Sequence, residues 1–208
     1  MRIIAGTYGG RTIKAVPGSV TRPTASRIRE AWASSVASLL PGGFEGTTVL
    51  DAFAGSGALG IEALSRGATD AVFVETSPRA VSVLKQNLSI LDTNRHAATL
   101  LALDVFTSNA IRVLNKTGPY DLVILDPPYD SSVNRLCRWL QRLIENRLLK
   151  AGSLVSYEQQ SKGGLPLTDS LLLSSGSLGG LMMVSCKTYG TTRLEYFSYQ
   201  EGHSTEEH

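Results

Sequence analysis

A short strand, a glycine turn and a helix start constrain this chain most. Residues 47–50 are β-branched and apolar, so they predict a buried strand that ends at Asp51. Gly55 and Gly57 follow; without a Cβ they allow a tight turn against which a ligand can lie. From Gly57 to about residue 65, apolar residues recur at helical spacing. Such a turn exposes free N–H groups and a partial positive charge, which is typical of a nucleotide-binding site.

The glycine spacing alone leaves two cofactor classes open. Gly55, Gly57 and Gly60 fit the G-x-G-x-x-G pattern of dinucleotide-binding proteins. Asp51 favours S-adenosylmethionine, because a carboxylate there would repel a pyrophosphate but can pair with a methionyl ammonium, directly or through water. A nicotinamide-dependent oxidoreductase stays an alternative, although no Tyr-x-x-x-Lys pair is evident.

The length and composition describe one globular domain with a small appendage. The chain has 208 residues, of which 42% are apolar and 18% charged. It has no apolar run of membrane-spanning length, and its start is too short for a signal sequence, so a cytoplasmic protein without a membrane partner is expected. Cys137 and Cys186 have no nearby histidine, so we expect two reduced core thiols and no metal site.

The N-terminal 41 residues predict an extension to this domain. Residues 2–16 resemble a hairpin around a Tyr-Gly-Gly turn, and a helix is expected from after residue 24 to about residue 40. Residues 1–30 are strongly basic, with Glu30 as their only acid. Such a segment suits RNA, although a solvated basic face explains it equally well. The basic residues are Arg2, Arg11, Lys14, Arg22, Arg27 and Arg29, of which the first four are our RNA-binding candidates.

The rest of the chain alternates strands and helices. This order predicts an α/β fold with a parallel sheet covered on both faces. Residues 159–180 are expected to form a loop with some strand, and residues 200–208 a disordered tail. Further strands are expected at 71–75, 97–103, 120–125 and 154–157, helices at 78–91, 107–115 and 133–144, and a final hairpin at 181–199.

Acidic residues end four successive predicted strands: Asp51, Glu75, Asp104 and Asp126. Ligands of such sheets bind beyond the carboxyl ends of the strands, so the four acids indicate one site. Glu75 follows Gly57 by 18 residues and can accept both ribose hydroxyl protons. Asp104 can accept from an adenine amino group, or it can cap the next helix.

The sequence Asp126-Pro127-Pro128-Tyr129 points to the methylation of a base amine. Two prolines after a strand force a rigid, exposed turn. The Asp126 carboxylate and the Pro127 carbonyl can accept both N–H bonds of an exocyclic amine and aim its weakly nucleophilic lone pair at a sulfonium methyl group. Tyr129 offers a face on which a flipped base can stack. A structural turn with a packed tyrosine is the alternative reading.

Several of these segments together resemble one family. They are residues 2–6, 22–30, 52–68, 72–75, 126–129 and 187–190. They are similar to the bacterial 16S ribosomal RNA guanine-N2 methyltransferases that modify guanine 966. The resemblance implies a Rossmann-like class I methyltransferase with a seven-stranded, mostly parallel sheet whose last strand is antiparallel, here over residues 42–199. It also implies S-adenosylmethionine as methyl donor and, as substrate, 16S rRNA within the 30S subunit or an assembly intermediate. A monomer is expected.

The resemblance also assigns residues by position. It assigns catalysis to Asp126, Pro127 and Tyr129, and cofactor binding to Thr24, Arg27, Asp51, Gly55, Ser56, Gly57, Glu75 and Asp104. Thr24 and Arg27 belong to the segment that closes over the site. Ser77 departs from the family, which usually has an acidic or amide residue at that position. A DNA adenine-N6 or cytosine-N4 methyltransferase stays an alternative, but it would need a target-recognition region for which the chain has no room. A non-catalytic RNA-binding assembly factor with the same fold is a further one.

Overall fold

The computed structural model describes residues 1–17, 26–91, 97–128, 131–161, 167 and 179–201. Within them, one seven-stranded sheet runs in the order β3-β2-β1-β4-β5-β7-β6. Its strands are β1 (Thr48–Asp51), β2 (Asp70–Glu75), β3 (Ala97–Ala102), β4 (Tyr120–Leu125), β5 (Leu149–Gln160), β6 (Leu181–Tyr189) and β7 (Thr192–Tyr199). β1 to β5 pair in parallel, and β7 runs antiparallel to both of its neighbours. The mostly parallel sheet that the resemblance implied is therefore confirmed.

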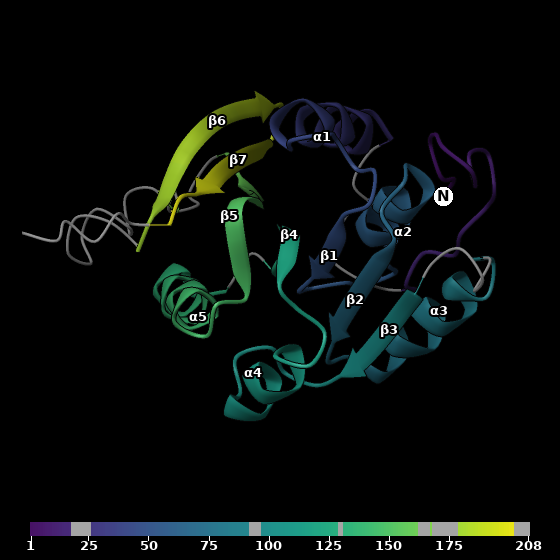
Figure 1. Ribbon diagram of the computed structural model, residues 1–208. Helices are drawn as coiled ribbons and strands as arrows, with labels where there is room; N and C mark the ends of the chain where they lie inside the picture. The colour runs from purple at the N-terminus through teal and green to yellow at the C-terminus, as the bar shows by residue number, and fades with distance from the viewer. Residues whose placement is uncertain (18–25, 92–96, 129–130, 162–166, 168–178, 202–208) are drawn as a thin grey trace, which may run out of the picture.

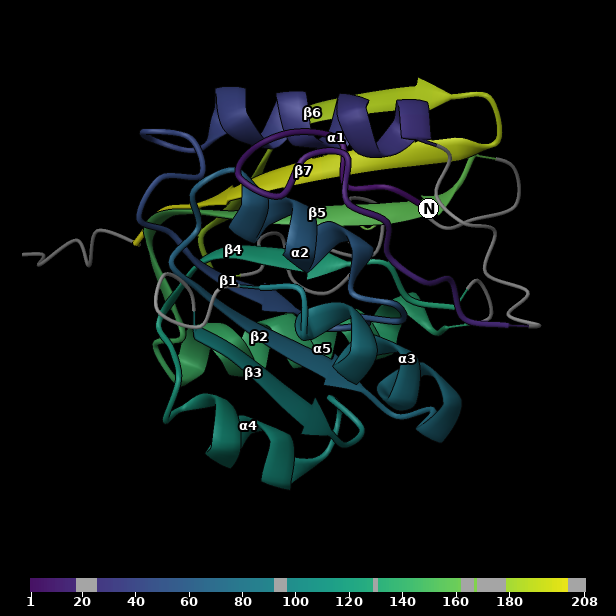
Figure 2. The same cartoon turned by 90° about the vertical axis from the view of Figure 1, so that its right-hand side faces the viewer.

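Five helices of the described residues cover both faces of this sheet (Figures 1 and 2). They are α1 (Ser26–Leu39), α2 (Ala58–Ser65), α3 (Pro78–Leu88), α4 (Ser108–Leu114) and α5 (Val133–Glu145). The first three cover one face, and α4 and α5 cover the other. Alternate strand residues therefore enter different cores: Leu122 packs with α1 and α2, whereas Val123 packs with α5.

The predicted N-terminal hairpin is present only in part. Arg2 and Thr12 form an antiparallel bridge, and around it Ile3 donates to the Arg11 carbonyl (3.0 Å) and Ile13 donates to the Met1 carbonyl (2.9 Å), but residues 1–17 contain no regular strand. The next two residues bind α2, where Glu62 accepts the backbone N–H groups of Ile4 (2.8 Å) and Ala5 (3.2 Å). The short pairing is therefore attached to this helix and is not extended into a second sheet.

Close packing against α2 requires the glycine at position 6. Gly6 has a φ of +82°, and a Cβ there would collide with the backbone oxygen of Ser65. Thr7 donates to that same oxygen (2.7 Å), and Tyr8 donates to the Ser65 hydroxyl (3.0 Å). Ile3, Tyr8 and Ile13 are consequently buried in the core beneath α1 and α2, so the N-terminal segment is built into the domain's packing.

Two sequence expectations need correction. β5 begins at Leu149 and ends at Gln160, beyond both ends of the predicted strand, because β7 pairs with its polar C-terminal half. Cys137 is buried as expected, but Cys186 is exposed, since most of β6 at the sheet edge faces outward. In the part of the chain that the structure describes, no helix is long and apolar enough to cross a membrane.

Candidate functional site

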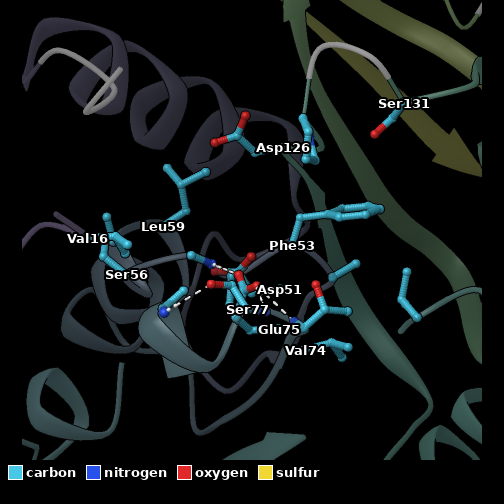
Figure 3. A pocket seen from close by; sticks show the side chains of 18 of the residues that line it. Val16, Asp51, Phe53, Ser56, Leu59, Val74, Glu75, Ser77, Asp126 and Ser131 are labelled. Carbon is cyan, nitrogen blue, oxygen red and sulfur yellow. Dashed lines mark hydrogen bonds between the residues drawn. The ribbon is translucent and has the colours of Figure 1, made fainter. Parts of the chain in front are cut away.

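A cavity of about 550 Å³ lies at the carboxyl ends of the parallel strands. All four strand-end acids, Asp51, Glu75, Asp104 and Asp126, line it, so the structure brings together the residues that the sequence placed at one edge of the sheet. Figure 3 shows that Asp51 and Glu75 lie together, that Asp126 lies across the cavity from them, and that the ring of Phe53 lies between. The cavity therefore has an end formed by the glycine turn and an end formed by the proline turn.

The three glycines of the turn have different structural roles. Gly55 has a φ of +53°, and nothing lies within 4 Å of where its Cβ would be, so its bare backbone faces open space at the cavity. Gly57, with a φ of +81°, is the N-cap of α2, and a Cβ there would collide with Leu84 of α3. A Cβ on Gly60 would collide with the Phe73 ring. Only Gly55 leaves room for a ligand; the other two allow close packing.

Asp51 is almost completely buried at the end of β1, with 2% of its surface exposed. Its Oδ2 accepts the backbone N–H of Gly60 (3.1 Å), which fixes the carboxylate beneath the start of α2. Burial raises the pKa of Asp51 to about 7, an effect that the Gly60 hydrogen bond opposes and that the nearby carboxylates of Asp126 and Glu75 reinforce. The group is therefore placed to be stabilised by a cation entering the cavity.

The carboxylate of Glu75 organises the adjacent backbone. Its Oε2 accepts from the N–H of Gly55 (2.8 Å), and its Oε1 accepts from the N–H groups of Thr76 (2.8 Å) and Ser77 (2.7 Å). Each carboxylate oxygen can accept more than one hydrogen bond, so the group can still bind hydroxyl protons of a ligand. Ser77 caps α3 by accepting from Ala80 at 3.4 Å, which gives a structural role to the residue that departs from the family.

Asp104 does not cap the following helix, because Thr107 does so. Instead, Asp104 accepts the N–H of Phe106 (2.9 Å) and forms an ion pair with Arg135 of α5 (3.0 Å). The Arg135 guanidinium also lies 4.0 Å from the centre of the Phe106 ring. Arg135, Phe106 and Phe53 line the cavity, but the sequence analysis did not select them. Phe53 adjoins the glycine turn and could have been chosen, whereas no spacing pattern marks Arg135.

The proline turn places Asp126 on the cavity wall directly after β4. Asp126 is half-buried, and burial raises its pKa to about 6. Pro127 is buried, whereas Pro128 lines the cavity and its carbonyl accepts the N–H of Ser131 (2.9 Å). Tyr129 lies outside the described residues. The carboxylate of the predicted catalytic motif is thus exposed to any ligand in the cavity.

The N-terminal segment forms another part of the cavity wall. Met1, Ala15 and Val16 line it. Asn87 of α3 holds this segment in place: it accepts from the N–H of Lys14 (2.8 Å) and donates to the carbonyls of Lys14 (2.9 Å) and Ser56 (2.7 Å). A single buried amide therefore connects the segment to the glycine turn.

The basic candidates differ in their surroundings. Arg2, Arg11 and Lys14 are exposed, whereas Arg29 is buried and donates to the Arg2 carbonyl (2.9 Å). Arg27 is exposed on the first turn of α1 and does not line the cavity. Thr24 and Arg22 lie outside the described residues.

Comparisons with known sequences place the chain in one family and match it to proteins named as rRNA methyltransferases. The model of a family described as "Conserved hypothetical protein 95" matches residues 1–198. YlbH of Bacillus subtilis, provisionally named an rRNA methyltransferase, is 34% identical over 95% of this chain and 98% of its own. Ribosomal RNA small subunit methyltransferase D of Escherichia coli K12 is 33% identical over 80% of this chain and 78% of its own.

Solved structures similar to this chain are also described as methyltransferases. The Escherichia coli protein yhhF, provisionally described as a methyltransferase, is 29% identical, with a TM-score of 0.73 over 97% of this chain and 99% of its own. Magnesium protoporphyrin IX methyltransferase of Synechocystis, solved with bound S-adenosylmethionine, is 16% identical, with a TM-score of 0.61 over 84% of this chain and 79% of its own. The fold is therefore the Rossmann-like class I methyltransferase fold.

Proposed function

The chain belongs to the family described as "Conserved hypothetical protein 95", and we propose that it transfers a methyl group from S-adenosylmethionine to the exocyclic N2 amine of a guanine in 16S rRNA. The guanine is of the position-966 type, within the 30S subunit or an assembly intermediate. One observation supports this most: a single cavity contains the glycine turn with its acids and, across from them, the Asp126 carboxylate.

The residues around the glycine turn fit S-adenosylmethionine. The bare backbone at Gly55 leaves room for the cofactor, and the Glu75 carboxylate can accept its ribose hydroxyl protons. The buried Asp51 carboxylate suits its ammonium group better than it suits a pyrophosphate, because two anions would repel each other. Ser56 and Asp104 also line this cavity. When bound, the cofactor supplies an electrophilic methyl group on a sulfonium sulfur.

The proline turn fits the acceptor of that methyl group. In our proposal, Asp126 and the Pro127 carbonyl accept the two N–H bonds of the guanine amine and hold its lone pair toward the methyl group. Transfer would form the N–C bond and break the S–C bond of the sulfonium, leaving a neutral thioether. The Asp126 carboxylate would stabilise the positive charge that develops on the nitrogen and then accept its proton. Tyr129 would stack on the flipped base. We also propose that Thr24 and Arg27 bind the cofactor as part of a segment that closes over the site.

The rRNA substrate is supported by the names of the relatives and by the exposed basic residues near the cavity. Residues of the segment that carries Arg2, Arg11 and Lys14 line the cavity, so RNA bound to this segment would bring a base close to the site. An expected monomer in the cytoplasm is part of the same proposal. The second candidate, a DNA adenine-N6 or cytosine-N4 methyltransferase, is favoured only by the four residues of the proline motif.

Transfer of tritium from labelled S-adenosylmethionine tests the proposal. We expect label in 16S rRNA of 30S particles prepared without the modification, and none in duplex DNA. Nucleoside analysis should give N2-methylguanosine. Methylated adenine or cytosine would contradict the assignment, and the absence of label in every substrate would favour a non-catalytic assembly factor.

Cofactor binding can be tested separately by thermal unfolding. S-adenosylmethionine should raise the Tm by mass action, while NAD should not. Replacing Glu75 with Gln removes the charge that we expect to hold the ribose, so Glu75→Gln should weaken cofactor binding roughly tenfold. Asp70→Asn, at the opposite end of β2, is the matched control and should bind normally. Stabilisation by NAD alone would overturn the cofactor assignment.

A further inference from the structure

A second carboxyl group lies beside Asp126 on the neighbouring strand. β4 and β5 lie side by side (Figure 2) and pair in parallel, with Leu125 opposite Tyr157 as the last pair. Asp126 and Glu158 are the residues that follow this pair, and they are close enough for the charge of Asp126 to act on Glu158. Leu125 and Tyr157 pack in the core beneath α5. Since side chains alternate between the two faces, continuing this pairing by one residue places Asp126 and Glu158 on the opposite face, on adjacent strands about 4.8 Å apart.

Glu158 is deeply buried, with 8% of its surface exposed, and it does not line the cavity. No ion pair involves it in the described part of the chain. Around it, β7 contributes Leu194 and Tyr196, and α1 packs on β5 through Trp32, which donates to Ser156 (3.1 Å). Lys187 of β6 lies opposite Leu194, which in turn lies opposite Glu158, but its ammonium group donates to Ser35 of α1 (3.0 Å).

Such surroundings favour a neutral acid at Glu158. An ionised carboxylate without a cation is costly in a protein interior, and a second negative charge on the adjacent strand increases the cost. Burial, reinforced by the charge of Asp126, raises the pKa of Glu158 to about 9, whereas that of Asp126 is about 6. Burial therefore opposes a negative charge on Glu158 more than on Asp126, which is only half-buried and lines the cavity.

We propose that Glu158 is a positioning residue for Asp126: it keeps its proton, donates toward the Asp126 carboxylate from behind the cavity, and thereby holds that carboxylate ionised and oriented toward the base amine. This role rests on the proposed methyl transfer. A protonated carboxyl group is a hydrogen-bond donor, and Asp126 has no other charged neighbour on β5. Glu158 does not touch the substrate in this proposal and acts only through Asp126.

The protonation of Glu158 can be tested without any activity. Its pKa is raised in the folded state, so its contribution to stability is complete below the unfolded value near 4.5 and is lost as pH rises toward 9. In urea unfolding from pH 6 to 8.5, the unfolding constant of the wild type should therefore rise about tenfold per pH unit relative to that of Glu158→Gln. Ser156→Ala, a non-ionising change on the same strand and face, should change stability without changing this pH dependence.

Parallel pH dependence of the wild type and Glu158→Gln would show that Glu158 is ionised when folded, which would overturn the inference. Because this measurement needs no substrate, its failure is distinguishable from failure of the proposed function.

The positioning role is tested by the pH profile of methyl transfer to 30S particles. Glu158→Gln keeps a donor of the same shape, so it should retain most activity at pH 7.5 and lose the wild-type decline above about pH 9. Glu158→Leu removes the donor, so kcat should fall about tenfold or more, with an acid limb shifted to higher pH and an unchanged KM for S-adenosylmethionine. If both variants kept the wild-type pH profile, or if kcat fell equally in both, Glu158 would have only a structural role.

Discussion

Carboxyl groups crowd one edge of this sheet, and each has different surroundings. Asp104 has an arginine partner at 3.0 Å, and Glu75 accepts three backbone N–H groups. Asp51 and Asp126 have neither a cation nor three donors among the described contacts, and their pKa values are raised to about 7 and about 6. Raised pKa values of this kind are expected of groups that meet a cation or a reacting amine.

Substitution of Asp126 should stop the reaction without releasing the cofactor. Asp126→Ala removes the acceptor of the base amine, so turnover should be abolished while the Kd for S-adenosylmethionine stays within about threefold. Asp126→Asn keeps an acceptor oxygen but loses the charge, so it should be slow but measurable. Single-turnover methylation and calorimetry measure the two effects, and full activity of Asp126→Ala would contradict the mechanism.

Tyr129 offers a separate test of base stacking. Tyr129→Phe keeps the aromatic face and should remain active, whereas Tyr129→Ala should lose roughly 1–3 kcal/mol of transition-state stabilisation. Comparison of kcat/KM for the two variants isolates the ring from its hydroxyl. Equal losses in both would assign the role to the hydroxyl instead.

Asp51 should make the free protein less stable as pH rises. Its folded pKa of about 7 lies above the ordinary value of 3.8, so its contribution to stability is complete below pH 3.8 and is lost as pH rises through 7. In the variant Asp51→Asn, the side chain at this position cannot ionise, so this contribution is absent. The free energy of unfolding of the wild type should therefore fall relative to that of the variant by up to about 1.4 kcal/mol per pH unit between pH 5 and 7. Urea unfolding at several pH values measures this, and identical slopes would contradict a buried, shifted Asp51.

At the scale of elements, the glycine turn allows α2 and α3 to pack closely and also lines the cavity. Gly57→Ala should cost roughly 2–5 kcal/mol, because it adds a clash with Leu84 to the strain of a left-handed backbone. Gly10→Ala is a matched control: Gly10 has the same φ of +81°, but nothing lies within 4 Å of its Cβ position, so only about 1–2 kcal/mol of strain is expected. Urea unfolding measures the loss of stability in the two variants. Equal losses would mean that α3 moves away from the added methyl group without a measurable loss of stability.

At the scale of the whole molecule, the N-terminal segment connects an exposed basic surface to the cavity. Its deletion would remove buried side chains and part of the cavity wall, so it would test folding more than RNA binding. Arg11→Gln with Lys14→Gln is a milder change, because Arg11 and Lys14 are exposed. The double variant should bind 30S particles more weakly. The slope of log K against log salt concentration should also become shallower, by an amount that corresponds to the loss of up to about two phosphate contacts.

Lys116→Gln controls for general loss of charge in the same binding measurement. Lys116 is exposed and follows α4, just before β4 begins, at the edge of the sheet opposite the cavity. It should bind 30S particles like the wild type. Equal weakening by both changes would indicate non-specific attraction of RNA to the whole protein.

The sequence by itself determined the succession of strands and helices along the chain, the glycine turn, and the positions of the acids at the strand ends. These features are local: periodicity, turn residues and strand ends are encoded within a few positions of one another, and parallel strands bring their carboxyl ends to one edge. The four acids consequently meet in one cavity as predicted.

Only the tertiary structure decided which distant residues meet. Glu62 of α2 accepts hydrogen bonds from the N-terminal segment, Arg135 reaches Asp104 from α5, and Glu158 comes close enough to Asp126 to be affected by its charge because β5 pairs with β4. In the sequence, Glu158 is one of several polar residues at the end of a strand. Its burial, and hence its charge state, comes from strands and helices far along the chain, because the free energy of an ionised group depends on what surrounds it in space.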